Sequence, residues 1–287
     1  MPESSRPAFH TLLVLGRASN LPTVWSNCLA GYLLGGGSSG WRFLLLCLGG
    51  SLAYIGGMYL NDAFDADFDR QYRRERPIPS GRIEESLVWK LGWGMLAVGT
   101  VLLGGLGWTA ALCAVLLSLS VVLYDAIHKV IAFSPVLMSL CRFFLFLTAA
   151  AAGQRGITGY ALWSAFALAG WIIGLSYVAK RESTTGELQR WPLAVLALPV
   201  VLGGLLNNGD WRFRGLLLAS LLVVWAGWCL RHTFAIGPRN LGLTVAGLIA
   251  GICLVDLLAV APEPGFAVVF LILFGASLLG QRFVPAT

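Results

Sequence analysis

The chain has 287 residues, of which 57% are hydrophobic and 12% charged, and its mean hydropathy is +0.76. A soluble globular domain carries about 25% charged residues, so this composition excludes one. It predicts an all-α, polytopic transmembrane helical bundle, which we expect to form a single integral membrane domain over residues 1–287. The net charge of +6 belongs mainly to the loops. It therefore reports membrane orientation and contact with lipid headgroups, and not binding of nucleic acid.

Ten apolar stretches are candidates for membrane-spanning helices, which need about 20 residues each. In chain order they cover residues 11–35, 42–60, 86–106, 108–127, 133–153, 159–179, 191–207, 214–232, 240–260 and 266–282. The stretch at 191–207 is short and begins with Trp191 and Pro192. The sequence therefore predicts nine or ten helices.

Basic residues are divided unequally between the two sides of this layout. With the N-terminus in the cytosol, fifteen of the twenty Lys and Arg residues fall on the cytosolic side and four on the outer side. Cytosolic loops of membrane proteins carry the excess of Lys and Arg. We therefore expect a multi-pass protein of the bacterial inner (cytoplasmic) membrane, with the polar loops 61–85 and 180–190 facing the cytosol.

An acidic run followed by a basic run stands at the end of the second stretch, within residues 61–82. On a helix with about 100° per residue, Asn61, Asp62, Asp65 and Asp69 project from one face, and Asp67 points to the far side. Oxygen ligands of this kind suit Mg²⁺, which also binds substrate phosphates. The alternative is a solvated helix end of mixed charge. Like charges on one face repel unless a cation lies between them, so the pattern favours a Mg²⁺ site.

The two runs also resemble a known family. Residues 61–69 read N-D-A-F-D-A-D-F-D, which resembles the N-D-x-x-D-x-x-x-D motif of the UbiA superfamily of membrane prenyltransferases, and R-P-I-P-S-G-R at 76–82 resembles the R-P-x-x-S-G-x segment that follows it. The resemblance implies a ring of transmembrane helices around a central cavity. It implies that Mg²⁺ and basic residues hold an allylic diphosphate, whose prenyl group is joined to a lipophilic acceptor from the bilayer.

The resemblance also implies roles for individual residues. We expect the metal ligands to be Asn61, Asp62, Asp65 and Asp69, the catalytic residues Asp65, Asp69, Tyr124 and Tyr177, and the diphosphate-binding residues Arg17, Arg76, Arg82, Lys129, Lys180 and Arg181. For each basic residue, the alternative is a side chain that extends to the lipid headgroups. Residues 124–129 resemble the end of the family's fourth helix, and there Asp125 has the alternative of pairing with Lys129 at i,i+4.

The second aspartate motif of the family is altered in this chain. Residues 177–187 read Y-V-A-K-R-E-S-T-T-G-E, so Lys180 and Arg181 stand where the family has acidic residues. On a helix these two residues share a face with Tyr177, and this face could hold a phosphate by charge-assisted hydrogen bonds. The Y-V-A-K-R-E-S run, together with N-L-P-T-V-W-S-N at 20–27, resembles the EboC-like branch of the superfamily.

Two charged residues, Arg142 and Asp256, lie inside apolar stretches, where ionisable groups usually face the interior of the bundle. We expect them either to pair with each other or to place Arg142 in the cavity. The histidines, including His128, stand near the ends of stretches and show no spacing typical of metal ligands. They are expected at the membrane interface and not in a catalytic site.

These patterns predict a Mg²⁺-dependent membrane prenyltransferase that acts on a prenyl diphosphate and a lipophilic acceptor. The altered second motif leaves an alternative open. In that alternative the chain has the same fold but binds or moves an isoprenoid or another lipophilic metabolite without catalysis.

Overall fold

The computed structural model describes residues 9–180, 190–207, 209–234 and 239–286, and within these ranges it contains helices and no strand. The α-helices are α1 Phe9–Leu15, α2 Leu21–Leu34, α3 Gly40–Phe64, α4 Ala66–Tyr72, α5 Glu85–Gly104, α6 Trp108–Ile127, α7 Ser134–Ala151, α8 Gly159–Lys180, α9 Trp191–Leu196, α10 Leu198–Leu206, α11 Arg212–Phe234, α12 Leu241–Ala250, α13 Ile252–Ala259 and α14 Ala267–Gly280. The predicted all-α fold is confirmed.

Seven helical segments of the described chain are long and apolar enough to cross a membrane, and Trp191–Leu206 and Pro264–Gly280 are shorter apolar helices. The protein is therefore an integral, multi-pass membrane protein. Each of the ten predicted stretches contains helix, but three of them are interrupted. The first breaks at Arg17, whose backbone is left-handed with φ 42°. The seventh breaks before Pro199 and the ninth at Gly251.

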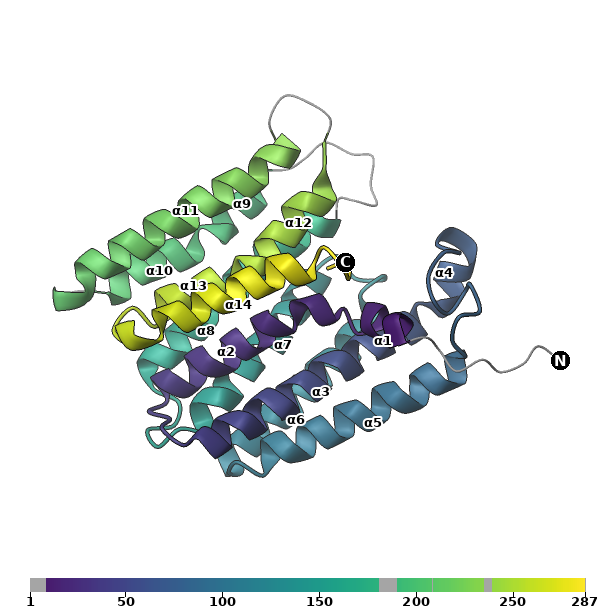
Figure 1. Ribbon diagram of the computed structural model, residues 1–287, viewed down its shortest axis with the longest axis horizontal. Helices are drawn as coiled ribbons and strands as arrows, with labels where there is room; N and C mark the ends of the chain where they lie inside the picture. The colour runs from purple at the N-terminus through teal and green to yellow at the C-terminus, as the bar shows by residue number, and fades with distance from the viewer. Residues whose placement is uncertain (1–8, 181–189, 208, 235–238, 287) are drawn as a thin grey trace.

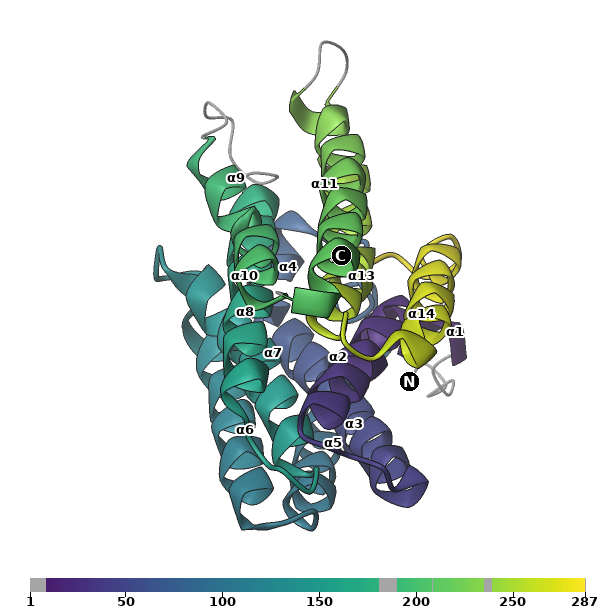
Figure 2. The same cartoon turned by 90° about the vertical axis from the view of Figure 1, so that its left-hand side faces the viewer.

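The helices lie roughly side by side and form a closed series of contacts (Figures 1 and 2). Going round, α2 packs on α3, α3 on α5, α5 on α6, α6 on α7, α7 on α8, α8 on α10, α10 on α11, α11 on α13, and α13 on α2. Buried apolar residues form one large cluster around α8 and α11 to α13, in the C-terminal half of this series, and others around α3, α5 and α6, in the N-terminal half. Residues of α2 and α7 take part in both halves. Helices α2, α7 and α8 contact each other where the halves meet.

The acidic residues lie where α3 passes into α4. The sequence predicts one continuous helix here, but α3 ends at Phe64 and α4 begins at Ala66. Asp65 joins them in a near-helical conformation, and the hydrogen bonds from Asp65 N to Asn61 O and from Asp69 N to Asp65 O keep the helical repeat. The expected facing therefore survives the break. Asp62, Asp65 and Asp69 are buried, whereas the side chain of Asp67 is 93% exposed.

Candidate active site

A cavity of about 390 Å³ lies between α3, α6, α7, α8 and α12. Most of its wall is apolar, with Leu117 and Val121 from α6, Leu145 from α7, and Ile172 and Leu175 from α8. The ends of α3, α6 and α8 and the start of α7 meet at one end of it. Polar side chains gather there, namely Arg17, Asn61, Asp65, Arg73, Arg76, Asp125, His128, Ser134 and Lys180. The cavity thus joins a polar mouth to an apolar interior.

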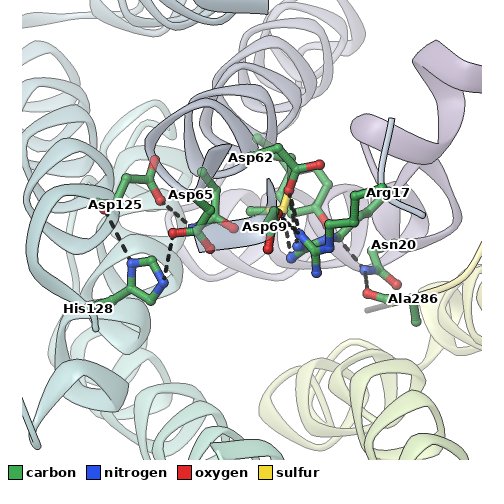
Figure 3. A network of polar contacts seen from close by, with 12 residues as sticks. Arg17, Asn20, Asp62, Asp65, Asp69, Asp125, His128 and Ala286 are labelled. Atoms are coloured by element: carbon green, nitrogen blue, oxygen red, sulfur yellow. Dashed lines mark hydrogen bonds and ion pairs between the residues drawn. The ribbon is translucent and has the colours of Figure 1, made fainter. Parts of the chain in front are cut away.

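Arg76, which lines this mouth, links two buried carboxylates that are not themselves lining residues, Asp62 and Asp69. Its Nη1 atom lies 2.9 Å from Asp62 Oδ1 and 3.5 Å from Asp69 Oδ2. Arg17 Nη2 lies 3.6 Å from the same oxygen of Asp62 (Figure 3). The backbone of Arg17 is left-handed and turns the chain before α2. Its side chain also donates a hydrogen bond to Met58 Sδ. Two carboxylates here share one cationic atom.

Asp65 is paired with the end of α6. Lys129 Nζ lies 2.7 Å and His128 Nε2 3.6 Å from Asp65 Oδ1. Burial by itself raises the pKa of the Asp65 carboxyl, but the hydrogen bonds from His128 and Lys129 outweigh it and hold the pKa below its usual value. The carboxylate is thus ionised and held in place. It is the group to which the basic residues that follow α6, His128 and Lys129, are anchored.

The suggested pair of Asp125 and Lys129 is wrong. Asp125 Oδ1 accepts a hydrogen bond of 3.0 Å from Asn61 Nδ2, and Lys129 reaches across to Asp65. The α6 helix ends at Ile127, two residues before Lys129, so an intrahelical i,i+4 pair is not imposed there. The Nδ2 atom of Asn61 is thus bonded to Asp125. The Oδ1 atom of Asn61 remains as the one that could bind a metal ion.

The donor set fits a Mg²⁺ ion that binds together with phosphate. Among the residues that the structure describes, no three His, Cys, Asp or Glu side chains are placed to hold a metal by themselves. Two carboxylates, Asp62 and Asp69, converge on the cationic Nη1 atom of Arg76, and Asp69 Oδ1 is buried without a hydrogen-bond partner. Proteins commonly bind Mg²⁺ with one or two carboxylates, waters and substrate phosphates. A site of this composition is therefore compatible with Mg²⁺.

Some of the other predicted site residues line the cavity and others do not. Tyr124 and Lys180 line the cavity, and Lys180 donates to Ile131 O, Ala132 O and Ser134 Oγ. The ring of Tyr177 packs on Trp191, with ring centroids 4.5 Å apart, and is not among the lining residues. Arg82 is exposed and does not line the cavity. Arg181 lies outside the described residues.

Sequence reasoning missed several polar residues of the cavity. His128, which was expected at the membrane interface, lines the cavity and stacks on Tyr124 with ring centroids 4.9 Å apart. Arg73 and Asn20 also line it. A helical repeat of three to four residues puts Tyr124, Asp125 and His128 on one face, and this signal could have found His128. Arg73 stands in the basic run without any spacing that distinguishes it from its neighbours.

These features define a class of protein: a multi-pass helical membrane protein whose intramembrane cavity ends in paired acidic and basic side chains. The sequence pattern of the UbiA prenyltransferase family matches residues 21–186, which is more than half of the chain. The chain belongs to this family. The finer resemblance to the EboC-like branch stays a prediction.

Two curated relatives share part of the sequence. A digeranylgeranylglyceryl phosphate synthase of Metallosphaera sedula is 31% identical over 117 residues, which are 39% of this chain and 40% of the relative. A protoheme IX farnesyltransferase of Cenarchaeum symbiosum is 36% identical over 104 residues, 34% of this chain and 33% of the relative. The chain thus matches less than half the length of either relative.

Solved structures share the fold over nearly the whole chain. A UbiA homologue from Archaeoglobus fulgidus, bound to GPP and Mg²⁺, has a TM-score of 0.66 and 12% sequence identity, and the match covers 95% of this chain and 99% of that one. An apo UbiA homologue from Aeropyrum pernix has a TM-score of 0.62 at 16% identity, with 97% and 99% covered. At these identities the likeness concerns the fold alone.

Proposed function

We propose that the protein is a membrane prenyltransferase that uses Mg²⁺ to transfer an isoprenyl group from an allylic diphosphate to a lipophilic acceptor. One observation carries the proposal. Three buried carboxylates are each paired with a basic side chain. Asp65, which lines the polar mouth of the cavity, is paired with Lys129, and Asp62 and Asp69 are paired with Arg76, which lines the same mouth. Buried charges are costly unless a partner compensates them. A purely structural role would not require so many of them beside a cavity.

The basic side chains supply the binding of the diphosphate. Arg17, Arg76, Lys129 and Lys180 carry positive charge at the mouth, and Arg76 offers a planar fork that can hold two phosphate oxygens at once. When a diphosphate enters, Arg76 can exchange carboxylate for phosphate contacts. This exchange would free Asp62 and Asp69, with the oxygen of Asn61, for a cation.

Mg²⁺, when bound at Asn61, Asp62, Asp65 and Asp69, would neutralise the charge that develops on the departing diphosphate. The chain itself supplies the remaining requirements. The apolar walls at Leu117, Val121 and Ile172 exclude water from the prenyl group, so that an acceptor competes with little water. Tyr124 faces the cavity near the mouth and can contact the reacting end of the prenyl group. Tyr177 remains a proposed catalytic residue on the family resemblance alone.

The membrane orientation belongs to the same proposal. The excess of basic residues in the loops supports an orientation with the mouth on the cytosolic side. A soluble diphosphate would be available there, and the acceptor would enter from the bilayer. The relatives named above come from archaea, so the bacterial inner membrane stays a prediction.

The test is diphosphate release by protein purified in mild detergent, with a panel of allylic prenyl diphosphates and lipid extract as the source of acceptor. We expect release that depends on Mg²⁺ and a prenylated lipid detectable by mass spectrometry. Asp69→Asn should abolish both, whereas Asp67→Asn, at an exposed position paired with Arg70, should retain both. Release without Mg²⁺ dependence, or equal loss in the two variants, would contradict the assignment.

The altered second motif favours a second candidate function. Lys180 and Arg181 stand where the family resemblance leads us to expect acidic residues, and a second Mg²⁺ would lack ligands there. The chain could then bind or move an isoprenoid without ionising its diphosphate. In that case the same assay would give tight binding of the prenyl diphosphate and no release with any member of the panel.

A further inference from the structure

A second polar group faces the cavity far from its mouth. Arg142 lies on α7, eight residues after Ser134, and both residues line the cavity. At about 1.5 Å per helical residue, Arg142 therefore lies roughly 12 Å deeper in the bundle than Ser134. The cavity is also lined by the apolar residues Leu145 and Ile172 and by Tyr54. A guanidinium at this depth is costly unless it has a function or a partner.

One edge of Arg142 is held in place by α2. Its Nη1 atom donates to Asn27 Oδ1 at 2.8 Å, and its Nη2 atom donates to Thr23 Oγ1 at 3.0 Å. The ring of Tyr54 lies against the guanidinium, with the centroid 5.4 Å from Cζ. An arginine has five N–H donors in a fixed plane. The two bonds to α2 fix that plane and leave further donors for a molecule in the cavity.

Asp256 balances the charge of Arg142 through Asn27. The two do not form the direct pair that the sequence allowed. Asp256 is fully buried, and its Oδ2 atom accepts from Asn27 Nδ2 at 2.7 Å and from Ser26 Oγ. Asn27 thus accepts from the arginine with its oxygen and donates to the carboxylate with its nitrogen. With Arg142 cationic and Asp256 ionised, the network of Arg142, Asn27 and Asp256 is neutral as a whole, and its hydrogen bonds hold it in one orientation.

We infer that the remaining donors of Arg142 form the subsite for the polar end of the acceptor, and that this subsite takes an uncharged oxygen, a carbonyl or a hydroxyl, in preference to a carboxylate. The inference rests on the proposed function. An uncharged oxygen gains a charge-assisted hydrogen bond and leaves the network neutral. A carboxylate would add an unbalanced negative charge next to Asp256, in surroundings where burial of a charge is costly.

The position suits an acceptor beside a prenyl chain. The apolar wall between the mouth and Arg142 can accommodate the hydrocarbon part of the donor, whose diphosphate stays with Arg76. The oxygen of the acceptor is then anchored about two helical turns below the mouth. Arg142 is therefore a residue that positions the acceptor and selects its chemistry.

The test compares two probes of the same size, tridecan-2-one and dodecanoate, at a pH where the carboxylate is ionised. Binding to purified protein is measured by native mass spectrometry, without diphosphate or Mg²⁺. We expect wild type to prefer the ketone. Arg142→Met should lower the affinity for the ketone roughly tenfold to a hundredfold, as expected for loss of a hydrogen bond to a charged group. The matched variant Arg212→Met, at an exposed position on α11, should not change it.

A second variant separates recognition from folding. Asp256→Asn keeps the shape of the side chain but removes the balancing charge, so its preference should shift from the ketone toward dodecanoate. The double variant Arg142→Met with Asp256→Asn leaves no unbalanced charge in the bundle. It should remain folded, as judged by thermal unfolding, and still lack the affinity for the ketone.

The outcomes test the acceptor subsite and the transferase function separately. Binding of a prenyl diphosphate with Mg²⁺, measured separately, should be the same in wild type and Arg142→Met. If no diphosphate binds but the probes behave as expected, the subsite stands and the transferase function fails. Three results overturn the subsite: no binding of the ketone by wild type, unchanged binding by Arg142→Met, or no shift toward dodecanoate in Asp256→Asn.

Discussion

Burial separates aspartates that lie close together in the sequence. Asp65 is 6% and Asp69 1% exposed, whereas the side chain of Asp67 between them is 93% exposed. The helical repeat turns Asp67 toward solvent, where it pairs with Arg70 at 2.7 Å. An exposed ion pair of this kind contributes about 0–1 kcal/mol. The buried carboxylates instead form ion pairs with Arg76 and Lys129. Removing one partner of such a pair leaves the other charge buried and uncompensated, which is costly.

We predict that Asp65→Ala abolishes Mg²⁺-dependent binding of a prenyl diphosphate, and that Asp67→Ala leaves it nearly unchanged. Asp65 pairs with Lys129 and His128 beside the cavity, so its loss removes a proposed metal ligand and also releases the side chains of Lys129 and His128. The measurement is a titration of a prenyl diphosphate analogue with and without a chelator. Equal losses in the two variants, at unchanged expression and thermal stability, would show that Asp65 and Asp67 do not lie on opposite faces of the helix as described.

We predict that Arg76→Ala weakens binding of the diphosphate analogue by roughly 10- to 100-fold, because a hydrogen bond to a charged group is worth about 1.5–3 kcal/mol and each decade corresponds to about 1.4 kcal/mol. Arg82→Ala is the matched control, since Arg82 is exposed in the same loop and does not line the cavity. Its affinity should stay within about twofold of wild type, a change below about 0.5 kcal/mol. Similar losses at both positions would indicate a diffuse basic surface and not a defined phosphate site.

At the scale of single elements, glycines set how closely α3 and α5 approach. A Cβ atom built at Gly56 would lie 2.7 Å from Leu96 N, and one built at Gly99 would lie 2.7 Å from Ala53 N. The two backbones are therefore in contact, as is typical of small residues at helix interfaces in membranes. Helix α3, which carries Asn61 and Asp62 near its end, is therefore packed directly against α5.

We predict that Gly99→Ala lowers the thermal stability of the protein in detergent, whereas Gly94→Ala on the same helix does not. Overpacking of a tight contact costs about 1–3 kcal/mol, and the methyl group at position 99 would meet backbone atoms that cannot move aside. Nothing lies within 4 Å of a Cβ atom at Gly94, and replacing an exposed helical glycine with alanine favours the helix. A stable Gly99→Ala variant would mean that α3 and α5 separate easily.

At the scale of the whole molecule, the chain brings its polar loops to one end of the bundle. Lys129, in the loop after α6, bonds Asp65 at the end of α3. Lys180 at the end of α8 bonds carbonyls of residues 131 and 132. In Figure 1, α4 lies at the same end of the bundle as α1. The mouth of the cavity is thus assembled from parts that are more than a hundred residues apart.

We predict that this end faces the cytosol. A cysteine introduced at exposed Ser80 should resist an impermeant thiol reagent in intact cells and react in inverted vesicles. A cysteine at Ser38, in the turn between α2 and α3, should show the opposite pattern. The six native cysteines are buried or half-buried, so they contribute little background. Labelling of Ser80→Cys from outside would overturn the orientation.

The sequence by itself determined the class of fold and the chemistry of the mouth. Apolar stretches of membrane length are a local property, because a bilayer excludes unpaired backbone groups whatever the neighbouring helices do. The helical period likewise placed Asp62, Asp65 and Asp69 on one face, and this facing survived the break at Asp65 because backbone hydrogen bonds continue across it.

Only the tertiary structure decided which charges meet. Lys129 pairs with Asp65 instead of Asp125, and His128 lies in the cavity. Asn27 bridges Arg142 and Asp256. Each of these arrangements depends on contacts between different helices. The period of one helix gives the direction of a side chain but not the partner that a neighbouring helix brings to it. In a low-dielectric interior that partner determines whether a charge is stable, and so the packing of the bundle determined the site.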